Sequence, residues 1–397
     1  MATSSVVTWR AGSFCGNPRV RAANPLAGLA LRDRCCLLIA DLPDMHDAGM
    51  AQDTSPLPAL HTLTGLSHQR WGDFLDNIAS LLPAGAASVV IDGPGEQPGT
   101  VADRLAATLR AAGRPCSRLA GTTPLAADAA ADADDRTVVL ADGPGWRTAR
   151  GWDVVIWLRT DPASPGHHPG GEAGASIVID LNDPAWPVIR RVAAPLARHG
   201  LWYISETRAF FSARAATWDT KFGDDLPAYA AAIAQARIPQ HGVVIDVGCG
   251  TGRALPALRQ AVGPHGTVIA VDLTPEMLRH ARTKGRTAHA ALILADARYL
   301  PFASASADAV FAAGLVMHLP DTEAGLRQLA RITRPGGLLI LFHPSGRAAL
   351  AARHGRILEP DEPLAAGPLQ RLTRNTGWHL TTYDDAVYRF LAIATRE

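Results

Sequence analysis

The sequence predicts an α/β fold in two domains, each built on a mainly parallel sheet. The chain of 397 residues is longer than one domain usually is, and 47% of its residues are hydrophobic, which is ample for two packed cores. Short apolar runs alternate with helix-periodic segments in both halves, as is typical of strands covered by helices. The last two apolar runs follow each other directly, which indicates an antiparallel strand pair at the end of the second sheet.

The first half is expected to hold a domain at residues 67–200, preceded by an extension of unknown role at 1–66 with one possible strand at 35–42. Apolar periodicity predicts helices at 71–82 and 101–112, and a helix over 186–200 is expected to close the domain. Buried strands are predicted at 88–92, 137–142, 153–160 and 176–181.

The second half is expected to hold a helical connector at 201–240 and a domain at 241–397. Its strands are predicted at 243–247, 267–272, 291–296, 308–314 and 338–343, and its helices at 253–262, 275–284 and 322–332. The C-terminal stretch predicts one more helix and then two strands around a turn at Asp384 and Asp385. This series predicts a doubly wound sheet with an antiparallel strand pair at its end.

Charge and cysteine content restrict the partners. The net charge is +1 at pH 7, so no broad positive field attracts nucleic acid or an anionic membrane, and small molecules or proteins are the expected partners, a second copy in a homodimer included. We expect a cytoplasmic protein, because no apolar leader or run of about 18 apolar residues occurs and the five cysteines lack disulfide or zinc spacing. His167 and His168 lie on a glycine and proline loop without a third ligand nearby, so no metal site is expected.

The strongest motif is VVIDVGCGTGR at 243–253. An apolar strand delivers Asp246 and then three glycines, Gly248, Gly250 and Gly252, which permit a tight turn where a ligand can approach the backbone. The spacing is GxGxG, and Arg253 stands where the dinucleotide fingerprint has its third glycine. The motif therefore favours a ligand without a pyrophosphate.

Two further acids end the next two predicted strands. Asp272 is placed to accept hydrogen bonds from both hydroxyls of a ribose, and Asp296 from the amino group of an adenine. Because ligands of open α/β sheets bind at the carboxyl ends of the strands, these acids and the glycine turn predict one nucleoside site.

The segments DVGCGTGR, VDLTPEML, ADARYLPF, DAVFAAGLVMHLPD and LARITRPGGLLILF resemble class I S-adenosylmethionine-dependent methyltransferases of the ubiquinone/menaquinone methyltransferase-like group, over about 204–397. The resemblance implies a Rossmann-like sheet and S-adenosylmethionine as cofactor. It implies that Asp246 and the three glycines surround the methionine moiety, that Asp272 binds the ribose and Asp296 with Ala297 the adenine, and that Trp218 and Asp219 cover the cofactor. By the same resemblance the cofactor site also takes in Cys249, Thr251, Leu273 and Gly314.

Methyl transfer from a sulfonium needs alignment, exclusion of water and, for some acceptors, a base. His318 is the main candidate for the base or a substrate contact, with a purely pocket-shaping role as the alternative, and His343 is a weaker candidate. Tyr203, Tyr229 and Arg298 are equally compatible with substrate contacts and with structural roles. We expect transfer to oxygen, nitrogen or activated carbon of a small molecule, because the motifs of DNA amino-methyltransferases and of metal-dependent catechol sites do not occur.

The first half contains part of a phosphate-binding loop. Gly93, Gly95, Gly99 and Thr100 occur in IDGPGEQPGT, but the lysine of GxxxxGK[ST] does not, since the only lysines are Lys221 and Lys284. The surrounding strands resemble uridine kinase and related nucleoside kinases over about 67–200, which implies a degenerate P-loop kinase-like sheet. Asp92, Asp142 and Arg159 stand where such kinases carry chemistry, or are ordinary strand-end residues.

Three functions stay open at this point. The first is a methyltransferase with a kinase-like relic, and the second is a bifunctional enzyme that also phosphorylates a nucleoside. The third is a regulatory protein that binds S-adenosylmethionine without transferring its methyl group. A nicotinamide oxidoreductase is disfavoured by the glycine spacing.

Overall fold

The computed structural model describes residues 37–38, 60–119, 135–149, 151–160, 171–197, 201–221 and 223–397. The chain divides into two compact units. Among the described residues, the N-terminal unit holds those within 60–209 and Ala351–Ile357, and the C-terminal unit holds 37–38, Phe210–Leu350 and Leu358–Glu397. The predictions for His167, His168 and most of 1–66 lie outside the described residues.

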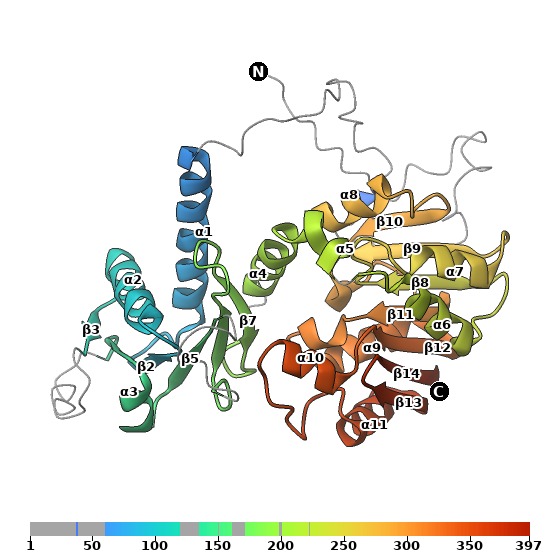
Figure 1. Ribbon diagram of the computed structural model, residues 1–397. Coiled ribbons are helices and arrows are strands. Elements are labelled where there is room, and N and C mark those ends of the chain that lie inside the picture. The colour runs from blue at the N-terminus through green and yellow to red at the C-terminus, as the bar shows by residue number, and fades with distance from the viewer. Residues whose placement is uncertain are drawn as a thin grey trace. The chain divides into compact units, whose positions relative to one another are not determined.

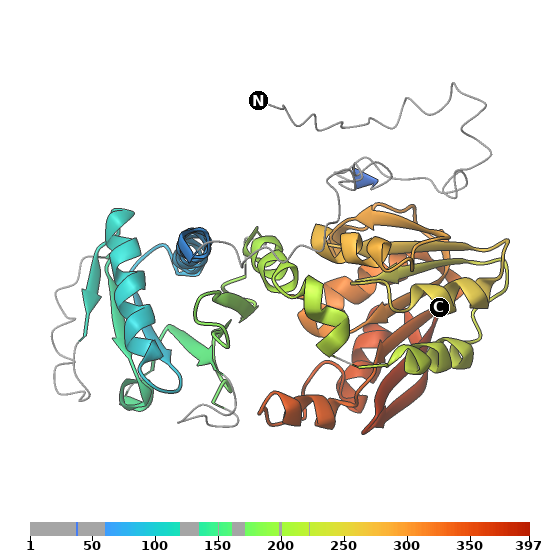
Figure 2. The ribbon, with the colours of Figure 1, turned by 45° about the horizontal axis from the view of Figure 1, so that its top comes forward.

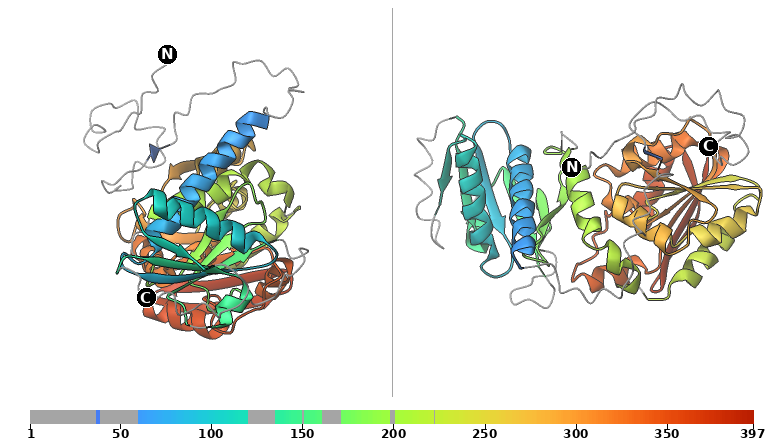
Figure 3. Two further views of the ribbon diagram at one scale, coloured as in Figure 1. Left: turned by 90° about the vertical axis from the view of Figure 1, so that its left-hand side faces the viewer. Right: turned by 90° about the horizontal axis from the view of Figure 1, so that it is seen from above.

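The N-terminal unit is built on a six-stranded sheet in the order β3-β4-β2-β5-β6-β7, parallel except for β7. Its strands are β2 (Ala87–Asp92), β3 (Cys116–Arg118), β4 (Val138–Asp142), β5 (Val154–Arg159), β6 (Ile177–Asp180) and β7 (Val188–Val192). Its helices are α1 (Leu60–Leu81), α2 (Gln97–Ala111) and α3 (Pro144–Ala149). The blue α1 and the cyan α2 lie side by side next to the strands (Figures 2 and 3).

The helix predicted over 186–200 is wrong, because part of this segment is the edge strand β7. Val188, Ile189 and Val192 are buried, and the strand pairs antiparallel with β6. A buried ion pair holds this edge, since Glu206 accepts hydrogen bonds from the Ile189 N–H at 2.8 Å and from Arg70 Nη2 at 2.5 Å. The β-branched residues and the open edge of β6 outweigh the helical periodicity of the segment.

The C-terminal unit is built on an eight-stranded sheet in the order β1-β10-β9-β8-β11-β12-β14-β13, most of which can be followed in Figure 1. Its strands are β1 (Leu37–Leu38), β8 (Val243–Val247), β9 (Thr267–Asp272), β10 (Ala290–Leu294), β11 (Ala307–Ala313), β12 (Thr333–His343), β13 (Trp378–Ala386) and β14 (Arg389–Arg396). The five strands from β10 to β12 in this order are parallel, and β1, β13 and β14 each run antiparallel to the strand they pair with. The predicted mixed α/β fold with two sheets and a terminal antiparallel pair is confirmed.

Helices cover both faces of this sheet. The helices of the C-terminal unit are α5 (Trp218–Lys221), α6 (Leu226–Ala236), α7 (Leu255–Val262), α8 (Pro275–Thr283), α9 (Thr322–Ile332) and α11 (Ala366–Asn375), with 3-10 turns η3 (Ala215–Thr217), η4 (Ala297–Tyr299) and η5 (Val316–His318). Helices α4 (Leu201–Ser212) and α10 (Arg347–Arg353) each cross a boundary between the two units. One apolar core contains residues of α9 and α11, and the other contains residues of α6 and α7. The sheet therefore lies between two hydrophobic layers, which explains its near-continuous apolar strands.

Two local predictions differ from the structure. The hairpin turn lies at Val387 and Tyr388, and Asp384 and Asp385 belong to β13, where Asp384 forms an ion pair with Arg389 across the strands. Both acids therefore form ion pairs within the strand region, Asp384 with Arg389 and Asp385 with Arg347, and neither forms the turn. The predicted connector is helical but interrupted, and the unit boundary falls inside α4. Among the described helices none combines the length and apolar character that spanning a bilayer requires.

Candidate cofactor site

The glycine turn joins β8 to α7 at the carboxyl edge of the sheet, where the strand order places β9 beside β8 and β10 beside β9. Asp272 ends β9, and Asp296 follows β10 by two residues. The three acids therefore lie at or just beyond the carboxyl ends of three adjacent parallel strands.

The glycines of the turn have positive φ angles, +77° at Gly248, +54° at Gly250 and +76° at Gly252, a region that side chains rarely adopt. A Cβ on Gly252 would lie 2.9 Å from Leu255 Cδ1, so this glycine also permits close packing of the turn on α7 and α8. On Gly250, by contrast, no described atom beyond its neighbours lies within 4 Å of a built Cβ. The turn is packed on one side and leaves open space above Gly250.

Asp272 fixes the shape of this turn. Its Oδ2 accepts a hydrogen bond from the Gly250 N–H at 2.9 Å, and its Oδ1 accepts one from the Thr274 N–H at 2.8 Å. Burial raises the pKa of this carboxyl group, and the two backbone donors oppose the rise. Leu273, between Asp272 and Thr274, is half-buried.

Asp246 lies at the start of the same turn and is 1% exposed. Neither carboxyl oxygen has a hydrogen-bond partner among the residues that the structure describes. Burial, followed by the charge of Asp272, raises the pKa of Asp246 well above its ordinary value. A buried carboxyl group without a partner is costly, so this position has a physical reason to receive a cationic or hydrogen-bonding ligand.

Asp296 caps η4 and pairs with a neighbouring arginine. Its Oδ1 accepts from the Arg298 N–H at 2.9 Å, and its Oδ2 lies 2.7 Å from Arg298 Nη2. Arg298 is therefore engaged with Asp296 on the cofactor side of the site. Ala297 is buried behind the cap.

The remaining cofactor candidates surround the turn. Thr251 Oγ1 donates to Asp219 Oδ1 at 2.6 Å, which connects the turn to α5, and the buried Cys249 packs into the core. Trp218 begins α5, and its ring meets that of Phe211 edge-on at 5.5 Å between centroids. Gly314 directly follows β11 with φ +66°, and its N–H donates to the Phe342 carbonyl at 2.9 Å.

The two candidate histidines have different surroundings. The His318 ring meets the Phe211 ring edge-on at 5.4 Å. The His343 ring lies beside a pocket, and its Nδ1 is within hydrogen-bond distance of the Ser345 carbonyl, at 2.9 Å, and of the Ser345 N–H, at 3.1 Å. These backbone contacts hold the His343 ring in one orientation.

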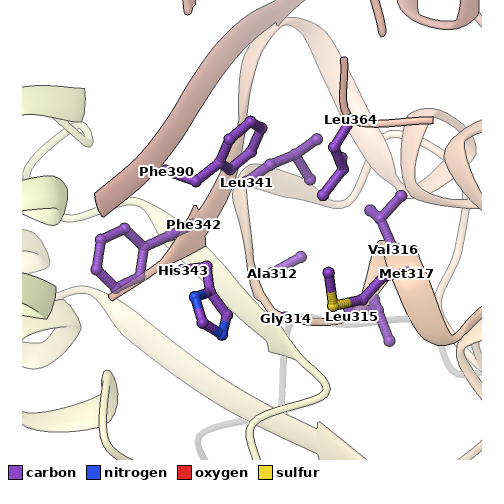
Figure 4. A pocket seen from close by; sticks show the side chains of 10 residues that line it. All are labelled: Ala312, Gly314, Leu315, Val316, Met317, Leu341, Phe342, His343, Leu364 and Phe390. Atoms are coloured by element: carbon purple, nitrogen blue, oxygen red, sulfur yellow. The ribbon is translucent and has the colours of Figure 1, made fainter. Parts of the chain in front are cut away.

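That pocket lies at the carboxyl ends of β11 and β12. Figure 4 shows the side chains that line it: Ala312, Gly314, Leu315, Val316, Met317, Leu341, Phe342, His343, Leu364 and Phe390. No lysine or arginine is among these described lining residues. Leu315 also contacts the glycine turn, since a Cβ on Gly248 would lie 3.1 Å from its Cδ1. The pocket thus adjoins the turn.

Sequence reasoning missed several residues of this region. It did not find the apolar pocket, and it gave no role to Arg253 and Arg286, which lie near Asp219. Tyr229, a candidate for substrate contact, is partly buried and packs against Phe342 at 4.8 Å between ring centroids, and desolvation raises its pKa. Tyr203 is buried within the N-terminal unit.

The strand-end residues of the N-terminal unit form ion pairs. Asp92 pairs with Arg147 at 3.2 Å, Arg159 pairs with Glu172 at 2.5 Å, and Asp142 pairs with Arg118. Helix α2 begins at Gln97, so Gly99 and Thr100 belong to its first turn and Gly93 and Gly95 to the loop before it. Pro98 removes one of the free N–H groups at the start of this helix.

The C-terminal part of the chain is similar to known proteins. Residues 245–341 match the family model described as a methyltransferase domain. The O-methyltransferase cnsE of Penicillium expansum is 32% identical over 152 residues, which cover 36% of this chain and 54% of that protein. A malonyl-[acyl-carrier protein] O-methyltransferase of Hahella chejuensis is 34% identical over 136 residues, which cover 34% of this chain and 48% of that protein. A solved methyltransferase of Aquifex aeolicus aligns over 47% of this chain and 98% of its own, at 19% identity and a TM-score of 0.40.

The C-terminal unit therefore contains a methyltransferase domain, and the predicted class I methyltransferase at this end of the chain is confirmed at the level of the domain. The chain spans about half the length of the two curated relatives named above. The family match lies entirely in the C-terminal unit, so the kinase-like interpretation of the N-terminal unit stays a prediction.

Proposed function

We propose that the protein is an S-adenosylmethionine-dependent methyltransferase whose chemistry resides in residues 204–397. The observation that carries the proposal is Asp246, a buried carboxyl group with no hydrogen-bond partner among the described residues, at the entry to a glycine turn. A ligand that brings positive charge and N–H donors would relieve this desolvated group. S-adenosylmethionine has a sulfonium and an ammonium group, so its charge suits such a site.

The other residues of the edge fit the rest of this cofactor. The open space above Gly250 gives the methionine moiety access to the backbone of residues 248–252. Asp272, with Leu273, is proposed to hold the ribose, because a carboxylate already bonded to two N–H groups keeps lone pairs for hydroxyl donors. Asp296 and Ala297 are proposed to hold the adenine, with Trp218 covering the site and Gly314 bordering it. When bound, the cofactor supplies a methyl group that is already activated.

The chain's own contribution is orientation, exclusion of water and, where needed, removal of a proton. We propose that the acceptor enters the apolar pocket between β11 and β12, which adjoins the glycine turn through Leu315. His343 borders this pocket and is the better placed proton acceptor, and His318 is the second candidate. Oxygen is the favoured accepting atom among oxygen, nitrogen and activated carbon, since two of the relatives are named O-methyltransferases.

For the N-terminal unit we propose a degenerate nucleoside kinase-like domain that serves as a scaffold or a dimer surface. The strand, loop and helix from β2 to α2 support this proposal, and the missing lysine argues against phosphoryl transfer. A bifunctional enzyme would hydrolyse or transfer phosphate from ATP, and this activity would be lost in Gly93→Val. Cytoplasmic location and a homodimer stay predictions.

The test incubates the full chain with cell extract and S-adenosylmethionine labelled in its methyl group, and mass spectrometry follows the label. We expect one labelled small-molecule product, its loss in Asp246→Asn, and a slower reaction in His343→Asn than in His318→Asn. Tight binding of the cofactor with no labelled product would favour a regulatory protein. Absence of cofactor binding would refute the proposal.

A further inference from the structure

The short helix α5 is fastened to the glycine turn by charged side chains. Asp219 on α5 accepts a hydrogen bond from Thr251 Oγ1 at 2.6 Å, and its Oδ2 lies 2.8 Å from Arg286 Nη1. The same Arg286 nitrogen donates to the Thr251 carbonyl at 3.0 Å. Arg286 therefore holds the helix and the turn together.

Arg253 gives the connection a second anchor. Its Nη1 lies 3.6 Å from Asp219, and its Nη2 donates to the Gly223 carbonyl at 3.1 Å and to Asp225. These contacts reach the segment between α5 and α6. The Arg253 side chain is only 5% exposed, and those of Arg286 and Asp219 are 14% and 17% exposed, so water screens these charges less than it screens surface pairs.

The same helix also reaches the acceptor side of the site through its first residue. Trp218 packs on Phe211, and Phe211 packs on His318, which follows β11. Movement of α5 away from the turn would break the charged contacts of Asp219 and disturb this aromatic chain together. The charged contacts thus fix the position of α5 relative to the turn.

We propose that Arg286 and Arg253 are positioning residues that latch α5 over the cofactor site, so that the bound nucleoside leaves only when Asp219 separates from them. The proposal rests on the proposed function, because it requires that S-adenosylmethionine and its demethylated product bind at the glycine turn. It goes beyond that function by assigning the residence time of the product to the ion pairs between Asp219 and the two arginines. Asp219, Arg253 and Arg286 are called the latch below.

The test measures dissociation of S-adenosylhomocysteine from the full chain by stopped-flow tryptophan fluorescence. We expect Asp219→Asn and Arg286→Gln each to speed dissociation by about 5- to 30-fold, the range for a coupling of about 1–2 kcal/mol. The double variant should be no faster than the faster single variant, because both substitutions break the same contact. Added NaCl should speed dissociation from the wild type more than from Asp219→Asn.

The matched control is Arg279→Gln on α8, which removes the same charge from a half-exposed arginine whose ion pair is with Glu276, at 3.7 Å. It should leave the dissociation rate within twofold of the wild type. Arg286→Lys, which keeps the charge, should keep most of the slow rate, and Arg286→Gln carries the test if Asp219→Asn fails to fold. Unchanged dissociation in Arg286→Gln with tight binding would overturn the latch. Failure of the wild type to bind would instead refute the proposed function.

Discussion

Asp246→Asn should stabilise the ligand-free protein at alkaline pH and abolish its response to the cofactor. The side chain keeps its shape, but the variant cannot place a negative charge where the structure provides no described hydrogen-bond donor. Leaving a buried polar group unsatisfied costs about 1–3 kcal/mol, and more when the group is charged. The amide also lacks partners, so we expect the gain in unfolding free energy to be about 1–2 kcal/mol at pH 8. For a unit of this size that is a rise of about 2–8 °C in Tm.

The stability difference between Asp246→Asn and the wild type should depend on pH, and the raised pKa of Asp246 sets the direction of this dependence. Because the pKa of Asp246 is raised in the folded protein, the folded state binds more protons than the unfolded state at pH values between the two pKa values. The stability contributed by the protonated form is complete below the unfolded pKa and is lost as the pH rises through the folded pKa. The variant lacks this loss, so its advantage should shrink as the pH falls. Thermal unfolding of the C-terminal unit at several pH values, with and without S-adenosylhomocysteine, measures both effects.

Asp308→Asn is the matched control, because Asp308 accepts a hydrogen bond from the Val243 N–H at 2.7 Å and pairs with Arg334 at 2.6 Å. We expect it to lower stability, since it weakens satisfied contacts, and to leave the response to S-adenosylhomocysteine intact. If Asp246→Asn were less stable than the wild type at pH 8, or still gained stability from S-adenosylhomocysteine, our account of Asp246 would be refuted.

Three further outcomes test other parts of the structure. Asp272→Ala should weaken S-adenosylmethionine binding by at least about tenfold, because one hydrogen bond to a charged group is worth about 1.5–3 kcal/mol. The circular dichroism spectrum of the variant should not change. Equal affinity by calorimetry would contradict the assignment of Asp272 to the ribose. Gly252→Ala should destabilise the C-terminal unit by about 1–3 kcal/mol, because φ is +76° there, and an unshifted urea midpoint would show that the turn tolerates a side chain. Glu206→Ala should destabilise the N-terminal unit by about 3–5 kcal/mol, because it leaves Arg70 buried without its partner, and a change below about 1 kcal/mol in urea unfolding would speak against that ion pair.

Strands that are buried on both faces were predictable, because such strands consist of continuous apolar residues. The strands β8 and β9 begin and end where the apolar runs of the sequence do. The strand within 186–200 was not predictable from its sequence, because its periodicity suits a helix and only the open edge of β6 makes part of it a strand. Helix α10 is missed because seven residues give too few turns for a periodic signal. The residue Asp384 suits a turn or a strand end equally well by its type. The structure places it in β13, where it pairs with Arg389 across the hairpin.

The candidate site divides in the same way. Strand topology alone brings Asp246, Asp272 and Asp296 to one edge, so their approximate placement follows from the alternation of strands and helices. The latch could not be predicted, because Arg286 meets Asp219 from a position 67 residues away in the chain. Side-chain pairing over such separations depends on packing that no local pattern encodes. The same holds for the apolar pocket, whose lining comes from β11, η5 and the residues between them, from β12 and β14, and from the segment before α11.

The three acids at this edge differ in their hydrogen bonding in the absence of a ligand. Asp272 is bonded to the backbone of the turn, and Asp296 to the backbone and side chain of Arg298, so both contribute to local structure without a ligand. Asp246 contributes no such bond among the described residues, and its burial is a net expense to the fold. A buried group without a partner is tolerated where ligand binding offsets its destabilising effect. The Asp246→Asn variant should therefore gain stability and lose its response to the cofactor at the same time.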